Sequence, residues 1–154
     1  MENKNRATFK PLEIADISTI LQMMEDFYAI DNYPFDVVTS KKLFQEFILE
    51  EKFGKAWLIC KDNKIAGYII LTFVFSFEYG GKIAFVDELF IKETARGKGF
   101  GREAIQFVQQ EMLSLSLKLL YLEVEEQNEF AQKLYLAQDF LMHNRKFMKY
   151  KLPK

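Results

Sequence analysis

The sequence has few of the residues that build covalent or metal frameworks. Its 154 residues include one cysteine, one histidine, three prolines and seven glycines. One cysteine cannot form an internal disulfide. One cysteine and one histidine also provide too few soft ligands for a zinc site. We therefore expect no disulfide framework and no bound metal.

Net charge and long apolar runs are missing as well. The 21 basic and 22 acidic residues give a formal net charge of −1, which creates no long-range field to gather a polyanion. The longest apolar run, residues 69–77, contains Thr72 and Ser76 and is too short to span a bilayer. The first six residues are polar and lead into no apolar segment, so a secretory signal is not predicted. We expect a cytoplasmic protein that binds neither nucleic acid nor membrane.

Apolar side chains are plentiful enough for a substantial core. Hydrophobic residues make up 49% of the chain and aromatic residues 16%. The sequence has no internal repeat, no low-complexity tract and no linker rich in Pro, Gly or Ser. The prediction is a single domain over residues 1–154.

Hydrophobic periodicity predicts an alternation of strands and helices. The order β-α-α-β-β-β-α-β-α-β indicates an α/β (α+β) fold in which about four helices flank a mixed, mostly antiparallel sheet. Thr39 or Ser40 is expected to cap the second helix, and Asn128 the last one. Strands are expected at residues 7–10, 56–60, 65–77, 83–91, 119–124 and 145–152, and helices at residues 14–29, from 39 or 40 to 51, from 99 and from 128.

Three of the seven glycines fall within the turn Arg96-Gly97-Lys98-Gly99-Phe100-Gly101. This turn joins a predicted strand to a helix, where unpaired N–H groups and the helix dipole favour a phosphate. A tight connection with solvated basic residues is the alternative. The spacing fits neither the Walker loop nor the dinucleotide fingerprint.

The pattern Arg96-x-x-Gly99-x-Gly101 resembles the Arg/Gln-x-x-Gly-x-Gly/Ala signature of the GNAT superfamily of N-acetyltransferases. The predicted element order is also similar to that superfamily's order over nearly the whole chain. The resemblance implies acetyl-CoA as co-substrate and no metal. It favours the small-amine or polyamine acetyltransferase type. The cofactor-binding residues that it implies are Leu89, Phe90, Ile91, Arg96, Gly97, Lys98, Gly99, Phe100, Gly101, Arg102, Asn128, Ala131 and Tyr135.

A second pattern, Asn128-x-x-Ala131-x-x-x-Tyr135, places an amide and a phenol on one helix face. It is similar to the second GNAT signature, in which Asn contacts the cofactor arm and Tyr protonates the departing thiolate. An N-cap Asn with a packing Tyr is the alternative. Where the family often has Gly before the aromatic of the next turn, this chain has Asp139 before Phe140.

Transfer to an amine requires a group that accepts the amine's proton. Strand alternation puts Glu88 on the face of Phe90 and Asp87 on the other face, so Glu88 is the predicted catalytic base. Asp87, a water chain, or a solvated role for Glu88 remain open. An acidic-aromatic mouth suited to a cationic amine, or else a solvated loop, is predicted from Asp26, Tyr28, Tyr33, Glu78 and Glu88.

The predicted function is acetyl-CoA-dependent transfer of an acetyl group to a primary amine by direct attack. A small molecule or polyamine is the expected acceptor, with a peptide or protein amine as a further choice. Cys60 raises a covalent acetyl-enzyme as a rival, but it lies in an apolar run where burial raises a thiol pKa. A non-catalytic acyl-CoA-binding module is the main alternative, and a nucleic-acid binder using residues 145–154 is a third. Members of the resembled family often form dimers, so a homodimer is also considered.

Overall fold

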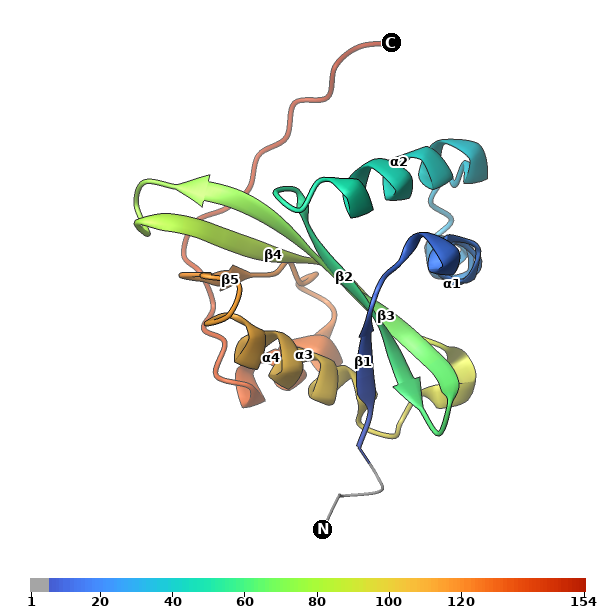
Figure 1. The fold of residues 1–154 in the computed structure, drawn as a ribbon. Coiled ribbons are helices and arrows are strands. Elements are labelled where there is room, and N and C mark those ends of the chain that lie inside the picture. The colour runs from blue at the N-terminus through green and yellow to red at the C-terminus, as the bar shows by residue number, and fades with distance from the viewer. Residues whose placement is uncertain (1–5) are drawn as a thin grey trace. The chain divides into compact units, whose positions relative to one another are not determined.

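A computed structural model describes residues 6–154, and its central feature is a five-stranded sheet (Figure 1). The strand order is β1-β2-β3-β4-β5, with antiparallel pairs throughout except for the parallel pair β4–β5. The strands are β1 (Thr8–Pro11), β2 (Gly54–Lys61), β3 (Lys64–Ser76), β4 (Gly81–Ile91) and β5 (Leu120–Tyr121). The helices are α1 (Ile17–Ile30), α2 (Val37–Leu49), α3 (Phe100–Glu111) and α4 (Glu129–Ala137), with 3-10 turns η1 (Ile14–Asp16) and η2 (Glu93–Ala95). The predicted fold class is confirmed.

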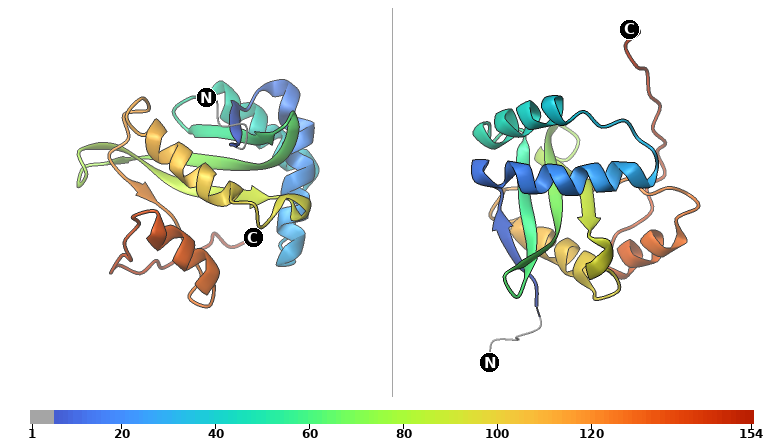
Figure 2. Two further views of the ribbon diagram at one scale, coloured as in Figure 1. Left: turned by 90° about the horizontal axis from the view of Figure 1, so that it is seen from below. Right: turned by 90° about the vertical axis from the view of Figure 1, so that its right-hand side faces the viewer.

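Helices cover both faces of the sheet, with α1 and α2 on one face and α3 on the other (Figures 1 and 2). Alternation along the strands supplies an apolar surface to each face. On the α3 face, the ring of Phe107 stacks on Phe9 at 4.1 Å between centroids and meets Trp57 edge-on at 5.3 Å. On the α1–α2 face, the buried core contains Ile20, Met24, Phe44, Leu58, Tyr68, Ile70 and Phe90.

Two strands differ from the prediction. β5 is two residues long rather than the six expected over residues 119–124. Residues 145–152 form no strand, although apolar and basic side chains alternate from Met148 to Leu152. A strand needs a neighbour for its backbone hydrogen bonds, and the only regular element between residues 124 and 154 is α4. The alternation of residues 145–152 alone was therefore insufficient to specify a strand.

The start of α2 also differs from the prediction. Asp36, not Thr39 or Ser40, is the N-cap residue, and its carboxylate accepts a hydrogen bond of 2.7 Å from the Thr39 N–H. Asp36 itself has an extended backbone, which allows its side chain to accept from an N–H group in the first turn of the helix that follows. The cap that the sequence predicted for α4 is confirmed, because Asn128 Oδ1 accepts from the Ala131 N–H at 3.1 Å.

The chain divides into two compact units, Met1–Glu123 and Val124–Lys154. The sheet and helices α1 to α3 belong to the first unit, and α4 belongs to the second. The single domain predicted over residues 1–154 stays a prediction. Among the described residues, no helix has the length and apolar character needed to cross a membrane.

Candidate active site

The glycine-rich turn adopts a backbone that most residues avoid. Gly97 and Gly99 have φ angles of 75° and 85°, in the left-handed region that glycine enters without steric cost. Gly99 is the N-cap of α3, so the first N–H groups of that helix have no carbonyl partner within it. A Cβ atom added to either glycine would meet nothing within 4 Å. Open space and unpaired donors therefore coincide at this turn.

The basic side chains of the turn anchor it to the end of β4. Arg96 Nε donates to the Ile91 carbonyl oxygen at 3.0 Å, and its guanidinium carbon lies 5.8 Å from the centroid of the Phe90 ring. Lys98 Nζ donates to the Thr94 carbonyl oxygen at 3.5 Å. Arg102 is the third residue of α3 and is exposed. Arg96 and Lys98 thus shape the turn and also bring positive charge to it.

β4 pairs with β5 over two residues only. Only Ala84 with Leu120 and Phe85 with Tyr121 are in register, and no described strand pairs with β4 after Phe85 on that side. The Lys92 N–H bonds to the Ala66 carbonyl in β3 at 2.8 Å. Because N–H directions alternate along a strand, Leu89 and Ile91 direct their N–H groups to the open edge, and Phe90 directs its own toward β3.

Glu88 is held at both carboxylate oxygens by phenols from two elements. The Tyr28 hydroxyl of α1 donates to Oε2 at 2.8 Å, and the Tyr68 hydroxyl of β3 donates to Oε1 at 2.7 Å. Tyr68 is fully buried, and Glu88 and Tyr28 line a cavity of about 420 Å³ on the α1–α2 face. Sequence reasoning missed Tyr68. A tyrosine within the apolar run of β3 was the available signal, since a buried phenol usually has a polar partner.

The environment of Glu88 favours its neutral form. Desolvation by burial is the main cause that raises the pKa of Glu88, and the charge of Asp87 raises it further. The hydrogen bonds from Tyr68 and Tyr28 lower this pKa, but the net result is a pKa above the ordinary value. Burial, followed by the charge of Glu88, raises the pKa of both Tyr28 and Tyr68. The two phenols therefore remain protonated donors, and Glu88 becomes a stronger base than an exposed carboxylate.

The predicted orientation of the acidic pair is corrected by a β-bulge. Ile70 pairs with Glu88 but Leu71 pairs with Val86, so Asp87 has no partner in β3. A bulge interrupts the strict alternation of side chains. Asp87 and Glu88 consequently line the same cavity rather than opposite faces of the sheet. Desolvation and the nearby charge of Glu123 raise the pKa of Asp87.

Only part of the predicted acceptor mouth comes together. Tyr28 and Glu88 share a cavity and a hydrogen bond. Asp26, Tyr33 and Glu78 are exposed and do not line that cavity, so their part in substrate binding stays a prediction. The residues that line it and were not predicted are Met24, Ser40, Leu43, Phe44, Glu46, Phe47, Phe53, Ile70, Thr72 and Asp87.

Within the second unit, α4 carries the Asn128, Ala131 and Tyr135 pattern. Burial raises the pKa of the Tyr135 phenol, whose ring lies 5.9 Å from that of Phe140 between centroids. Asp139 has a φ of 67°, so it takes the left-handed position in which the family often has glycine. Asp tolerates this conformation better than most residues, which explains how the turn forms without glycine.

Covalent catalysis by Cys60 and metal binding are two other chemistries that the described residues bear on. Cys60 packs against the α1–α2 core, and desolvation raises the pKa of its thiol, which disfavours the thiolate needed for a covalent acetyl-enzyme. Across residues 6–154, no three His, Cys, Asp or Glu side chains gather in an arrangement that could hold a metal ion.

Solved structures with the same fold cover nearly the whole chain. An integron cassette protein from the mobile metagenome of Cole Harbour Salt Marsh is 28% identical, with a TM-score of 0.85 over 98% of this chain and 93% of that one. A ribosomal-protein-alanine N-acetyltransferase from Brucella melitensis biovar Abortus 2308 is 18% identical, with a TM-score of 0.77 over 96% of this chain and 99% of that one. An aminoglycoside acetyltransferase from an uncultured soil metagenomic sample, in complex with sisomicin, is 14% identical, with a TM-score of 0.78 over 99% of this chain and 100% of that one.

The mixed sheet, the short pairing of β4 with β5 and the glycine turn are features of the acetyltransferase class of folds. The model of the acetyltransferase (GNAT) family matches residues 20–140, and the chain belongs to this family. It is therefore an acyltransferase, and the acyl donor that the family generally uses is acetyl-CoA. A search of curated proteins gives no match.

Proposed function

We propose that the chain transfers an acetyl group from acetyl-CoA to a primary amine by direct attack. The observation that carries the proposal is the Glu88 carboxylate, fixed by two phenols in a cavity next to the open part of β4. A positioned carboxylate of raised pKa is suited to accept a proton at neutral pH.

The residues present fit the donor. Acetyl-CoA supplies the acetyl group as a thioester. The N–H groups at the start of α3, with Gly97 and Gly99 open to solvent, suit its pyrophosphate. The main chain of residues 89–91 suits its amide-containing arm, as an added strand would pair with a sheet edge. A main-chain N–H on this open edge, at Leu89 or Ile91, would polarise the carbonyl.

Proton transfer to Glu88 would activate the acceptor. A primary amine with a pKa of about 10 is mostly protonated at neutral pH, so it must lose a proton before it attacks. Glu88 would take that proton, through a water molecule, and the neutral amine would then attack the thioester carbon. Asp87 lines the same cavity and would attract the cationic amine, or serve as the base in place of Glu88.

Tyr135 would protonate the leaving thiolate as the C–S bond breaks. A phenol of ordinary pKa about 10 gives its proton to a thiolate of pKa about 8.5 only uphill, by roughly 2 kcal/mol, so close placement is required. Asn128 and Ala131, on the same helix, would contact the cofactor arm.

A small-molecule amine, with polyamines included, is the proposed acceptor class. The cavity of about 420 Å³ combines the carboxylates of Glu46, Asp87 and Glu88 with aromatic side chains, which suits a cation. A neighbour of the same fold was solved with the aminoglycoside sisomicin bound, which supports testing that class first.

Release of free thiol from acetyl-CoA, measured over a panel of polyamines, aminoglycosides, amino acids and peptides, tests the proposal. We expect amine-dependent turnover with small cationic amines and an acetylated amine as product by mass spectrometry. Glu88→Gln should lower that turnover while CoA affinity is kept, and Glu25→Gln, an exposed change on α1, serves as the matched control. CoA binding without turnover for any amine would favour a non-catalytic acyl-CoA-binding module.

A further inference from the structure

The Glu88 cavity has a charged part and a larger apolar part. Asp87 and Glu88 are neighbours on β4, in the sheet face that α1 and α2 cover (Figure 1). Half of the residues that line the cavity are apolar, and most of these come from α2 and the connection that follows it. These six residues, called the apolar wall below, are Met24, Leu43, Phe44, Phe47, Phe53 and Ile70.

Two side chains of the apolar wall remain in contact with water. Leu43 is 58% exposed and Phe53 is 40% exposed. The main chain at Phe53 is fixed on both sides, because its N–H donates to the Glu50 carbonyl oxygen and its own carbonyl oxygen accepts from the Phe73 N–H, both at 2.9 Å. A ligand that covers these side chains would remove apolar surface from water without having to order the main chain at Phe53.

The cavity has few polar groups for a ligand that carries several hydroxyls or amines. The Tyr28 hydroxyl already donates to Glu88. Beyond the acidic pair on β4, the polar groups of the lining are the hydroxyls of Ser40 and Thr72 and the exposed carboxylate of Glu46. A polar group that leaves water without a new partner costs free energy. A ligand with one ammonium group and an apolar body avoids this cost.

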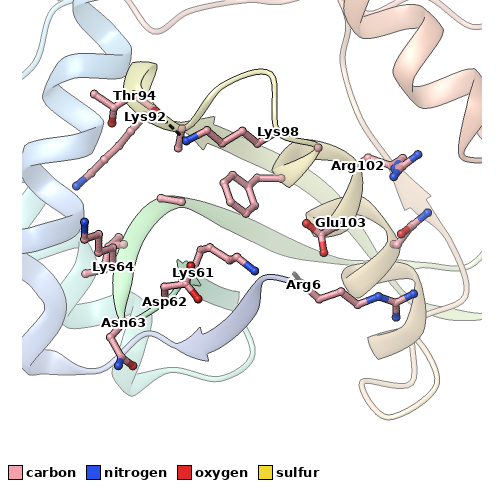
Figure 3. Close-up of a pocket in the computed structure, with 16 residues that line it drawn as sticks. Arg6, Lys61, Asp62, Asn63, Lys64, Lys92, Thr94, Lys98, Arg102 and Glu103 are labelled. Atoms are coloured by element: carbon pink, nitrogen blue, oxygen red, sulfur yellow. Dashed lines mark hydrogen bonds between the residues drawn. The ribbon is translucent and has the colours of Figure 1, made fainter. Parts of the chain in front are cut away.

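The hollow beside the glycine turn has the opposite charge. Six of its lining residues are basic, with Lys98 and Arg102 among them, and the proposed function puts the donor phosphates at this turn (Figure 3). Among the described residues that line the Glu88 cavity, none is basic. An acceptor that carries a carboxylate or phosphate of its own would therefore be repelled by Asp87 and Glu88.

We propose that the acceptor is a primary amine with a single ammonium group and an apolar body, either an aryl or a branched alkyl group. The ammonium group lies at Asp87 and Glu88, and the body lies against Leu43 and Phe53. This inference rests on the proposed function and narrows its acceptor class. In the transfer, the amine proton passes to Glu88, the nitrogen then attacks the thioester carbon, and the C–S bond breaks as CoA leaves with the proton of Tyr135.

The values of kcat/KM for 2-phenylethylamine, ethylamine, 1,4-diaminobutane and sisomicin, at one pH and saturating acetyl-CoA, test the inference. We expect 2-phenylethylamine to exceed each of the others by about tenfold or more, the usual discrimination that an apolar pocket gives. Phe53→Ala should lower the value for 2-phenylethylamine by about tenfold and that for ethylamine much less, since ethylamine has almost no apolar body. Leu43→Ala, at an exposed position of α2, tests the same wall in a second variant.

Phe77→Ala is the matched control, because Phe77 is exposed and does not line the cavity. It should leave all four values unchanged. Calorimetric titration of the full chain with 2-phenylethylamine, which requires no transfer, is a second measurement. We expect binding that Phe53→Ala weakens about tenfold and Phe77→Ala does not weaken.

The two measurements separate this inference from the proposed function. Turnover with no amine, together with the expected binding pattern, would reject the proposed function and keep the ligand class of the cavity. Faster turnover with 1,4-diaminobutane or sisomicin would keep the proposed function and overturn the inference. The inference would also be overturned by the absence of 2-phenylethylamine binding, or by equal losses in Phe53→Ala and Phe77→Ala.

Discussion

Glu88 shows how a single carboxylate acquires its properties from distant parts of the chain. Tyr28 lies 60 residues before it and Tyr68 lies 20 residues before it, yet both hydroxyls reach its oxygens. Their hydrogen bonds lower the Glu88 pKa while burial and Asp87 raise it. The resulting base strength therefore depends on residues that have no catalytic role of their own.

Tyr68→Phe tests this positioning role. Losing the Tyr68 hydroxyl removes a hydrogen bond that stabilises the Glu88 carboxylate, so the Glu88 pKa should rise further. The acid limb of the pH profile of kcat/KM should shift upward by about one pH unit, which corresponds to the usual strength of a hydrogen bond to a charged group. Tyr150→Phe, at an exposed position, provides the control. An unchanged profile would mean that Glu88 is not the base.

Tyr135→Phe tests the predicted acid. The pKa of the Tyr135 phenol is raised by burial, so the hydroxyl holds its proton at neutral pH. Steady-state kinetics should show kcat lowered by about 10² or more, the usual contribution of a general acid. CoA affinity, measured by calorimetry, should change little. Equal losses in turnover and affinity would make the phenol a binding group.

At the scale of elements, the connection from β4 to α3 depends on backbone conformation. Gly99→Ala places a Cβ on a residue with φ 85°, which costs about 1–2 kcal/mol of strain or shifts the turn. We expect weaker CoA binding and a lower free energy of unfolding. Gly101, which lies inside α3 and outside the left-handed region, provides the comparison, because Gly101→Ala should stabilise the helix slightly. Unchanged CoA affinity in Gly99→Ala would indicate that the turn does not bind the phosphates.

The N-cap of α2 gives a second test at this scale. Asp36→Ala removes the acceptor for the Thr39 N–H and should lower the free energy of unfolding by about 1 kcal/mol in chemical denaturation. Ser40→Ala should have little effect, because Ser40 lies inside α2 and Asp36 is the cap residue. A larger loss of stability in Ser40→Ala than in Asp36→Ala would instead support Ser40 as the N-cap, as the sequence predicted.

At the scale of the whole molecule, the acidic cavity links function to stability. Because burial raises the pKa of Glu88 in the folded state, its contribution to stability is greatest below the ordinary pKa and is lost as the pH rises through the folded value. Glu88→Gln removes the ionisation. Its stability relative to the wild type should therefore increase as the pH rises above the ordinary carboxyl pKa of about 4, while its activity stays below that of the wild type.

Thermal unfolding at several pH values measures this trend. Glu25→Gln, on the exposed side of α1, should keep the pH dependence of the wild type. A constant difference in stability between Glu88→Gln and the wild type at all these pH values would mean that Glu88 is not desolvated.

The homodimer, the cytoplasmic location and the single domain stay predictions. Light scattering of the full chain measures the oligomeric state.

Local sequence determined most of the elements and the general activity. Apolar periodicity located helices α1 to α4 and strands β1 to β4, because burying an apolar face is what stabilises each of them. The glycine spacing from Gly97 to Gly101 identified the family, since few residues accept the φ angles of Gly97 and Gly99.

Tertiary structure decided what depends on pairing between distant segments. Because of the β-bulge at Asp87, Asp87 and Glu88 line the same cavity. The alternation of residues along the sequence did not predict this bulge. The contacts of Tyr28 and Tyr68 with Glu88 required the packing of α1 and β3 against β4.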